Sequence, residues 1–221
     1  PFVGGDYLFN GILIPFLILS LAALGLNILT GYTGLLSLGS AGFMAVGAVA
    51  AYNFELRVEG MPVLVSFILA GLCAAGVGIL FGLPSLSIKG FYLAVAKLAS
   101  QFFVVWVLTK FGWFWHYRCY GVLSAQKIVI LGYVFETPVS RYLLTLAIVT
   151  VLALAAKNLV RSATGRAWMA VRDMDVAAEV IGIPILKTKL TAFAVSSFYC
   201  GIAGALWAFA YLGSVEPQAF D

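Results

Sequence analysis

Charged side chains are scarce in this sequence. Only 10% of its 221 residues are Asp, Glu, Lys or Arg, whereas 63% are hydrophobic. In soluble globular domains roughly a quarter of the residues are charged. The composition therefore excludes a soluble domain and indicates a chain that lies mostly in a lipid bilayer.

Chemically reactive side chains are also few. The cysteines Cys73, Cys119 and Cys200 lie far apart in the chain, so they form neither a disulfide framework nor a zinc cluster. The one histidine, His116, stands among aromatic residues without a second ligand or a nucleophile nearby, and we interpret it as a surface residue. We expect no catalytic residue, no metal site and no cofactor bound by this chain.

The phosphate-binding pattern G-x-x-x-x-G-K-[ST] is absent as well. In P-loop ATPases the backbone of this glycine-rich pattern cradles the phosphates of ATP. The chain is therefore not expected to hydrolyse ATP in that manner. Any energy for its work must come from a partner or from an ion gradient.

What the sequence does contain is long apolar runs. Six of them approach the ~20 residues that ~30 Å of hydrocarbon requires of a helix, and none alternates like a barrel strand. We predict an all-α, polytopic membrane fold with about six transmembrane helices. The expected spans are residues 8–29, 31–52, 62–83, 91–109, 141–160 and 190–213.

Residues 161–189 form the one long polar segment between two of these spans. Five cations lie in it, and cytoplasmic loops carry the excess of Lys and Arg, so we place this segment in the cytoplasm. The formal charge of +4 then reflects topology and not a nucleic-acid site. The cations are Arg161, Arg166, Arg172, Lys187 and Lys189.

The polar segment has the pattern of a short amphipathic helix from Gly165 onward. Apolar side chains recur at spacings of three and four, with charged residues around them. Gly182 and Pro184 are expected to end the helix, because glycine favours a left-handed cap and proline cannot continue the hydrogen-bond ladder. The apolar positions are Trp168, Val171, Met174, Ala178 and Ile181.

Two surfaces suit such a helix. It can lie in the headgroup region with its apolar face in the lipid, or it can dock in a groove of a soluble partner with Trp168, Val171 and Met174 as anchors. Asp173 and Asp175 slightly favour a protein partner, because negative charge weakens adsorption to anionic lipid.

Polar and small residues inside the spans suggest a path for a solute. The glycine-rich stretch 31–52 suits either a broken helix that lines a cavity or a close-packed helix face. Lys97 lies one turn from Gln101, and a lysine within a span costs about 2.5–3.5 kcal/mol on insertion scales. Lys97 is therefore either functional or accommodated by snorkelling, pairing or neutralisation. The candidate path residues are Ser37, Ser40, Gly42, Lys97, Gln101 and Ser196.

Several stretches resemble one known family. The runs GRAWMAVRDMDVAAEVIGI, KLTAFAVSSFYCGIAGALWA and VEPQAF, together with TGYTGLLSLGSAGFMAVGAVAAY and IKGFYLAVAKLASQF, are similar to LivM-type permease subunits of ABC importers for branched-chain amino acids. The resemblance implies one permease domain over residues 1–221. Because the chain begins at Pro1 and family members have further spans, we expect this domain to be incomplete.

In that family a cytoplasmic coupling helix docks on the ATP-binding subunit, which implies the same role for the loop 161–189. Ala177, Ala178 and Glu179 correspond to the family's Glu-Ala-Ala pattern in a different order, and Lys97 stands where a small hydroxyl residue is expected. The residues implied to contact the ATPase are Gly165, Arg166, Trp168, Arg172, Ala178, Glu179 and Gly182.

The resemblance also implies partners and a place in the cell. They are ABC ATP-binding subunits that bind ATP and Mg²⁺, a sister permease, a periplasmic substrate-binding protein and the lipid of a bacterial inner membrane; the cargo is leucine, isoleucine, valine or a related small amino acid or amide. A proton-coupled secondary transporter that uses Lys97 stays open as the alternative, although no buried carboxylate relay accompanies this lysine.

Overall fold

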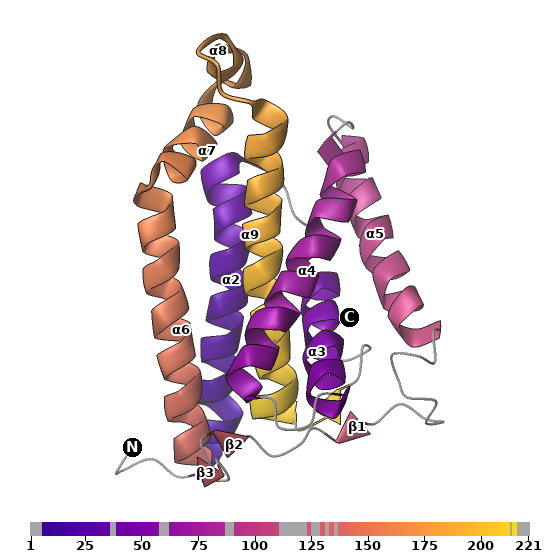
Figure 1. The fold of residues 1–221 in the computed structure, drawn as a ribbon, viewed down its shortest axis with the longest axis vertical. Coiled ribbons are helices and arrows are strands. Elements are labelled where there is room, and N and C mark those ends of the chain that lie inside the picture. The colour runs from indigo at the N-terminus through magenta and orange to yellow at the C-terminus, as the bar shows by residue number, and fades with distance from the viewer. Residues whose placement is uncertain are drawn as a thin grey trace.

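The computed structural model describes residues 6–35, 39–57, 62–86, 91–110, 123–124, 129–130, 133–134, 137–212 and 214–215. They form a bundle of helices, most of which run along one long axis (Figure 1). The first half holds α1 (Asp6–Leu8), the π-helical turn η1 (Phe9–Leu13), α2 (Ile14–Thr33), α3 (Ser40–Arg57), α4 (Val63–Leu86) and α5 (Phe91–Lys110). The second half holds α6 (Pro138–Arg161), α7 (Ala163–Asp173), α8 (Asp175–Val180), α9 (Ile185–Leu206) and the π-helical turn η2 (Trp207–Leu212).

The described residues also include four strands of two residues each, which lie at one end of the bundle. β1 (Leu123–Ser124) pairs with β4 (Ser214–Val215), and β2 (Val129–Ile130) pairs with β3 (Tyr133–Val134), both antiparallel. In Figure 1 β1, β2 and β3 are at the lower end, whereas α7 and α8 are at the upper end beside the C-terminal end of α2. The polar segment and these strands therefore lie at opposite ends of the bundle.

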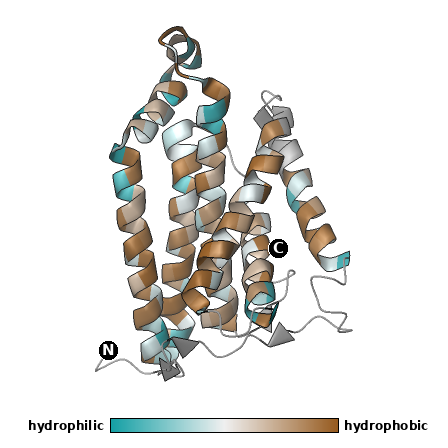
Figure 2. Cartoon of the chain, in the orientation of Figure 1, coloured by the Kyte–Doolittle hydropathy of each residue, from teal (hydrophilic) through white to brown (hydrophobic). Residues whose placement is uncertain are grey.

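The predicted all-α membrane fold is confirmed. Among the described residues, four segments are long and apolar enough to cross a membrane: Phe9–Thr33, Val63–Leu83, Pro138–Arg161 and Ile185–Leu212. Figure 2 shows hydrophobic residues along most of their length and hydrophilic residues near the helix ends. Within the described part of α5 the apolar segment Leu98–Lys110 is shorter, and α3 is not among the four, so the count of about six spans stays a prediction.

The helix α9 lies at the centre of the bundle. In the segment Ile185–Leu212, which contains α9, 78% of the most apolar stretch is buried, whereas the share in α6 is 17%. α9 packs against α2, α3 and α4. Small residues make this packing close: a Cβ atom on Gly47 of α3 would collide with the backbone of Gly201, and one on Gly78 of α4 would collide with Ser197. Small residues thus allow these helices to approach each other closely.

The glycine-rich stretch 31–52 is divided between two helices and is not one span. α2 continues through Gly31 to Thr33 and ends at Gly34, whose φ of 68° is left-handed. α3 starts only at Ser40. Because a Cβ on Gly42 would touch Gln101 in the middle of α5, α3 begins inside the bundle and not at its end. The stretch therefore contains a break between α2 and α3, and α3 itself is closely packed. Both predicted features are present.

Candidate functional site

The polar segment 161–189 forms two helices where the periodicity predicts one. α7 ends at Asp173, Met174 has an extended backbone with φ −153° and ψ 99°, and α8 begins at Asp175. The carboxylate of Asp175 accepts a hydrogen bond from the backbone N–H of Val176 at 2.9 Å. Such local side-chain contacts compete with a continuous helix, so the prediction of a single helix is wrong at this point.

The apolar face of α7 is turned toward the bundle. Trp168 is fully buried, and its Nε1 donates a hydrogen bond to Oγ1 of Thr191 in α9 at 3.2 Å. Val171 is buried beside it, and a Cβ on Gly165 would collide with the carbonyl of Val160. α7 thus packs against α2, α6 and α9. The interpretation of Trp168 and Val171 as anchors for a partner is wrong, because their own bundle already covers them.

Arg172 is directed toward the end of α2. One of its terminal nitrogens donates a hydrogen bond to the carbonyl of Gly31 at 2.8 Å. Its guanidinium also pairs with the carboxylate of Asp173, at 3.0 Å from Nε and 2.9 Å from Nη2. Arg172 therefore joins α7 to α2, a contact that the sequence pattern does not reveal.

The large apolar side chains of α8 and of the residues that flank it face outward. Met174 is 70% exposed, Val176 72%, Val180 82% and Ile181 73%. We call these four residues the α8 patch. α8 projects beyond the other helices at the upper end of the bundle (Figure 1). Four large apolar side chains exposed together are typical of a surface that another molecule covers.

The end of α8 follows the predicted pattern. Gly182 has a left-handed φ of 87°, its N–H bonds to the carbonyl of Glu179, and the N–H of Ile183 bonds to the carbonyl of Ala178. Pro184 is the N-cap residue of α9. The predicted helix end at Gly182 and Pro184 is confirmed.

The seven residues implied to contact an ATPase consequently divide into groups. Gly165, Trp168 and Ala178 are buried within the chain, and Arg172 is bound to α2. Arg172 is itself partly exposed, and the other three, Arg166, Glu179 and Gly182, are exposed as well. Arg166 donates a hydrogen bond to the carbonyl of Arg161 at 3.1 Å.

The candidate path residues are only partly brought together. Gly42 and Gln101 lie against each other between α3 and α5, and Ser40 is the first residue of α3. Ser196 lies instead in the contact of α9 with α2, where its carbonyl would be 3.1 Å from a Cβ on Gly25. Three sites of the prediction lie outside the described residues: Ser37, the side chain of Lys97, and His116 with the aromatic residues around it.

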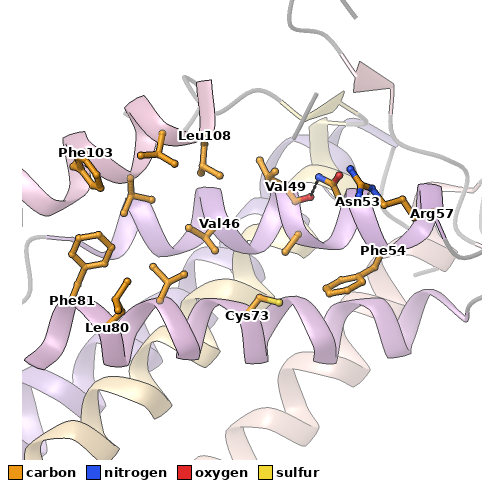
Figure 3. Close-up of a pocket in the computed structure, with 14 residues that line it drawn as sticks. Val46, Val49, Asn53, Phe54, Arg57, Cys73, Leu80, Phe81, Phe103 and Leu108 are labelled. Carbon is orange, nitrogen blue, oxygen red and sulfur yellow. Dashed lines mark hydrogen bonds between the residues drawn. The ribbon is translucent and has the colours of Figure 1, made fainter. Parts of the chain in front are cut away.

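A cavity of about 640 Å³ lies between α3, α4 and α5 (Figure 3). Its wall is apolar except at one end, where Asn53 and Arg57 of α3 line it. Asn53 donates a hydrogen bond to the carbonyl of Val49 at 2.9 Å. The predicted path residues with described side chains do not line this cavity. Its α3 wall could have been found from helical spacing, since Val46, Val49, Asn53 and Arg57 share one face.

Comparison with known proteins then identifies the family. A family model described as the permease component of branched-chain amino acid transport systems matches residues 8–221. The chain belongs to this family.

Individual relatives agree with that assignment. The high-affinity branched-chain amino acid transport system permease protein LivM of Salmonella typhimurium is 32% identical over an alignment of 231 residues. The alignment covers 89% of this chain and 51% of that protein. The LivM protein of Escherichia coli is 32% identical over 222 residues with the same coverage. This chain thus spans about half the length of these two curated relatives.

A more distant relative is archaeal. The probable branched-chain amino acid transport permease protein LivM of Methanocaldococcus jannaschii is 24% identical over an alignment of 249 residues. The alignment covers 96% of this chain and 70% of that protein. No solved structure matches the chain significantly. Family and apolar helices together make this a multi-pass membrane protein of the permease type.

Proposed function

We propose that this chain forms part of the permease subunit of an ATP-driven ABC importer for branched-chain amino acids or related small amino acids or amides. The observation that carries the proposal is the α8 patch, which exposes four large apolar side chains at one end of the helix bundle, in a chain of this family. In this proposal the chain is a non-catalytic subunit, and the ATP and Mg²⁺ are bound by a separate ATPase.

The α8 patch would be the docking surface for that ATPase. Val176 and Val180 are separated by one helical turn and therefore lie on one face of α8, and Glu179 is exposed next to Val180. A short helix with apolar anchors and a charge beside them suits helix-in-groove recognition. The lipid headgroup region is the other surface that such a helix could meet.

The remaining partners follow from the same proposal. A periplasmic binding protein would deliver the amino acid at the end of the bundle opposite α8, and a sister permease would complete the pore in a bacterial inner membrane. Closure of the ATPase dimer would move α8, and this movement would favour one of two arrangements of the helices. A conformational change of this kind requires contacts that differ between the two states.

Co-purification with the cognate ATPase tests the docking surface. In the complete importer, replacing Val180 and Ile181 together by serine should abolish recovery of the ATPase with the permease. Leu212→Ser is the matched control, because Leu212 is also an exposed apolar residue but lies at the end of η2, away from α8. Normal recovery of the ATPase by the double variant would contradict the proposal.

Uptake of radiolabelled leucine into proteoliposomes separates the proposal from its rival. An ABC importer should take up leucine when ATP is supplied to the side of the ATPase, whether or not a proton gradient is present. A proton-coupled secondary transporter would instead need the gradient and would be indifferent to ATP. Uptake that collapses with the proton gradient but survives ATP depletion would favour the rival.

A further inference from the structure

Arg172 lies between α8 and the C-terminal end of α2. It lies in the last turn of α7, two residues before the extended Met174 at which α8 departs. Its side chain does not point toward the α8 patch but crosses to α2, where it donates a hydrogen bond to the carbonyl of Gly31.

The chemistry of this contact makes it a strong one. Gly31 is among the last four residues of α2, whose carbonyls have no partner within the helix. These carbonyls form the negative end of the helix dipole, which a cation such as Arg172 stabilises. A hydrogen bond from a charged donor is also stronger than one between neutral groups.

Two neighbouring residues determine where the side chain of Arg172 lies. Oδ1 of Asp173 accepts a hydrogen bond from Nε and forms an ion pair with Nη2 at 2.9 Å. On the other side Gly34, with its left-handed φ, lets the side chain pass: a Cβ at this position would lie 3.1 Å from Cγ of Arg172. An open pocket of about 460 Å³ adjoins this junction and is lined by residues of the α2 end, the α7–α8 junction and Lys189. The arginine is therefore held at α2 but has space beside it.

We propose that Arg172 is a positioning residue that transmits movement of α8 to the C-terminal end of α2. Rotation of α8 about Met174 displaces the adjacent Asp173, and Asp173 draws the guanidinium onto the carbonyl of Gly31 or away from it. In the sequence α2 is followed after six residues by α3, which begins inside the bundle with Gly42 beside Gln101. The inference rests on the proposed function, because α8 must be moved by an ATPase for the link to act.

The test uses the complete importer in liposomes and measures leucine imported per ATP hydrolysed. Arg172→Gln should still co-purify with the ATPase and hydrolyse ATP, but the ratio should fall about 5-fold or more, as is typical when coupling between distant sites is lost. Arg172→Lys should recover part of the ratio, because lysine keeps the charge but not the rigid fork of donors. The matched control is Arg161→Gln, an exposed arginine at the end of α6 that should leave the ratio unchanged.

A second readout does not depend on transport. The N–H groups of Gly34 and Leu35 bond to the carbonyl of Leu29 at the end of α2. In Arg172→Gln these two amides should exchange with deuterium about 5-fold faster than in wild type, since the last turn of α2 loses its bound cation. Where the Arg172→Gln chain itself does not fold, Asp173→Asn keeps the arginine but removes its counter-charge, and should lower the transport ratio in the same direction.

Three results would overturn the inference. Unchanged ratio and exchange in Arg172→Gln would show that the contact transmits nothing. Loss of ATPase recovery would show that Arg172 is a docking residue instead. Faster exchange together with an unchanged ratio would leave Arg172 a purely structural role. A wild-type complex that imports no leucine with ATP would contradict the proposed function itself, and the exchange comparison would still report on the contact of Arg172 with α2.

Discussion

The helices α7 and α8 come from one continuous amphipathic pattern, yet they use their apolar faces in opposite ways. In α7 Trp168 is fully buried and bonded to Thr191. In α8 Val180 is 82% exposed and Ile181, which follows it, is 73% exposed. The two helices are separated by a single extended residue, Met174.

The difference in burial between α7 and α8 shows which part of the polar segment packs with the helix bundle. The buried side chains of α7 stabilise the bundle, so changes there should act on folding. The exposed side chains of α8 contribute little to the stability of this chain, so changes there should act on the recovery of a partner. Four substitutions test this division.

The largest effect is expected from Trp168→Ala in α7. Removing a fully buried tryptophan leaves a cavity and typically costs about 3–5 kcal/mol. We expect a large decrease in the temperature at which the detergent-solubilised importer loses its monodisperse elution peak. An unchanged melting temperature combined with loss of ATPase binding would contradict the assignment of α7 to the membrane domain, because it would make Trp168 a docking residue.

Val176→Asp in α8 should show the opposite behaviour. An anchor in the centre of a partner interface is worth about 2 kcal/mol, which corresponds to roughly 30-fold in affinity. We expect weaker binding of the ATPase in a titration, with a melting temperature near that of wild type because the side chain is exposed. Strong binding by this variant would indicate that the α8 patch faces lipid or another subunit.

Gly182→Ala concerns the turn between α8 and α9. A Cβ at this position would meet no neighbouring atom, so only the left-handed backbone opposes the substitution. That conformation costs about 1–2 kcal/mol for a residue with a Cβ. Gly182→Asn, which tolerates this conformation better, is the matched control and should lose less thermal stability than Gly182→Ala.

The smallest effect is expected from Thr191→Val in α9. It removes the acceptor of the Trp168 Nε1–H bond but keeps the shape of the side chain. This hydrogen bond is partly buried, and such a bond contributes about 0.5–1.5 kcal/mol. Thr191→Ser keeps the hydroxyl and should lie between Thr191→Val and wild type in thermal stability.

Much of the fold could be predicted from local patterns. The glycine-rich stretch 31–52 predicted a close-packed helix face, and Gly47 does lie against Gly201. The end of α8 at Gly182 was predictable because a left-handed cap needs only local chemistry. The partner of each face was not predictable: Gly42 meets Gln101, whereas Ser196 meets α2, and no periodicity distinguishes these contacts.

By itself the sequence determines the class of this protein, because scarce charge and long apolar runs permit only helices in a bilayer. It also determines the family, through residues 8–221. The tertiary structure alone decides that α7 is buried while α8 is exposed, that Arg172 reaches Gly31, and that α3 begins inside the bundle. The physical reason is that an amphipathic pattern states how apolar a face is but not what covers it, since its own bundle, lipid and a partner all satisfy the same pattern.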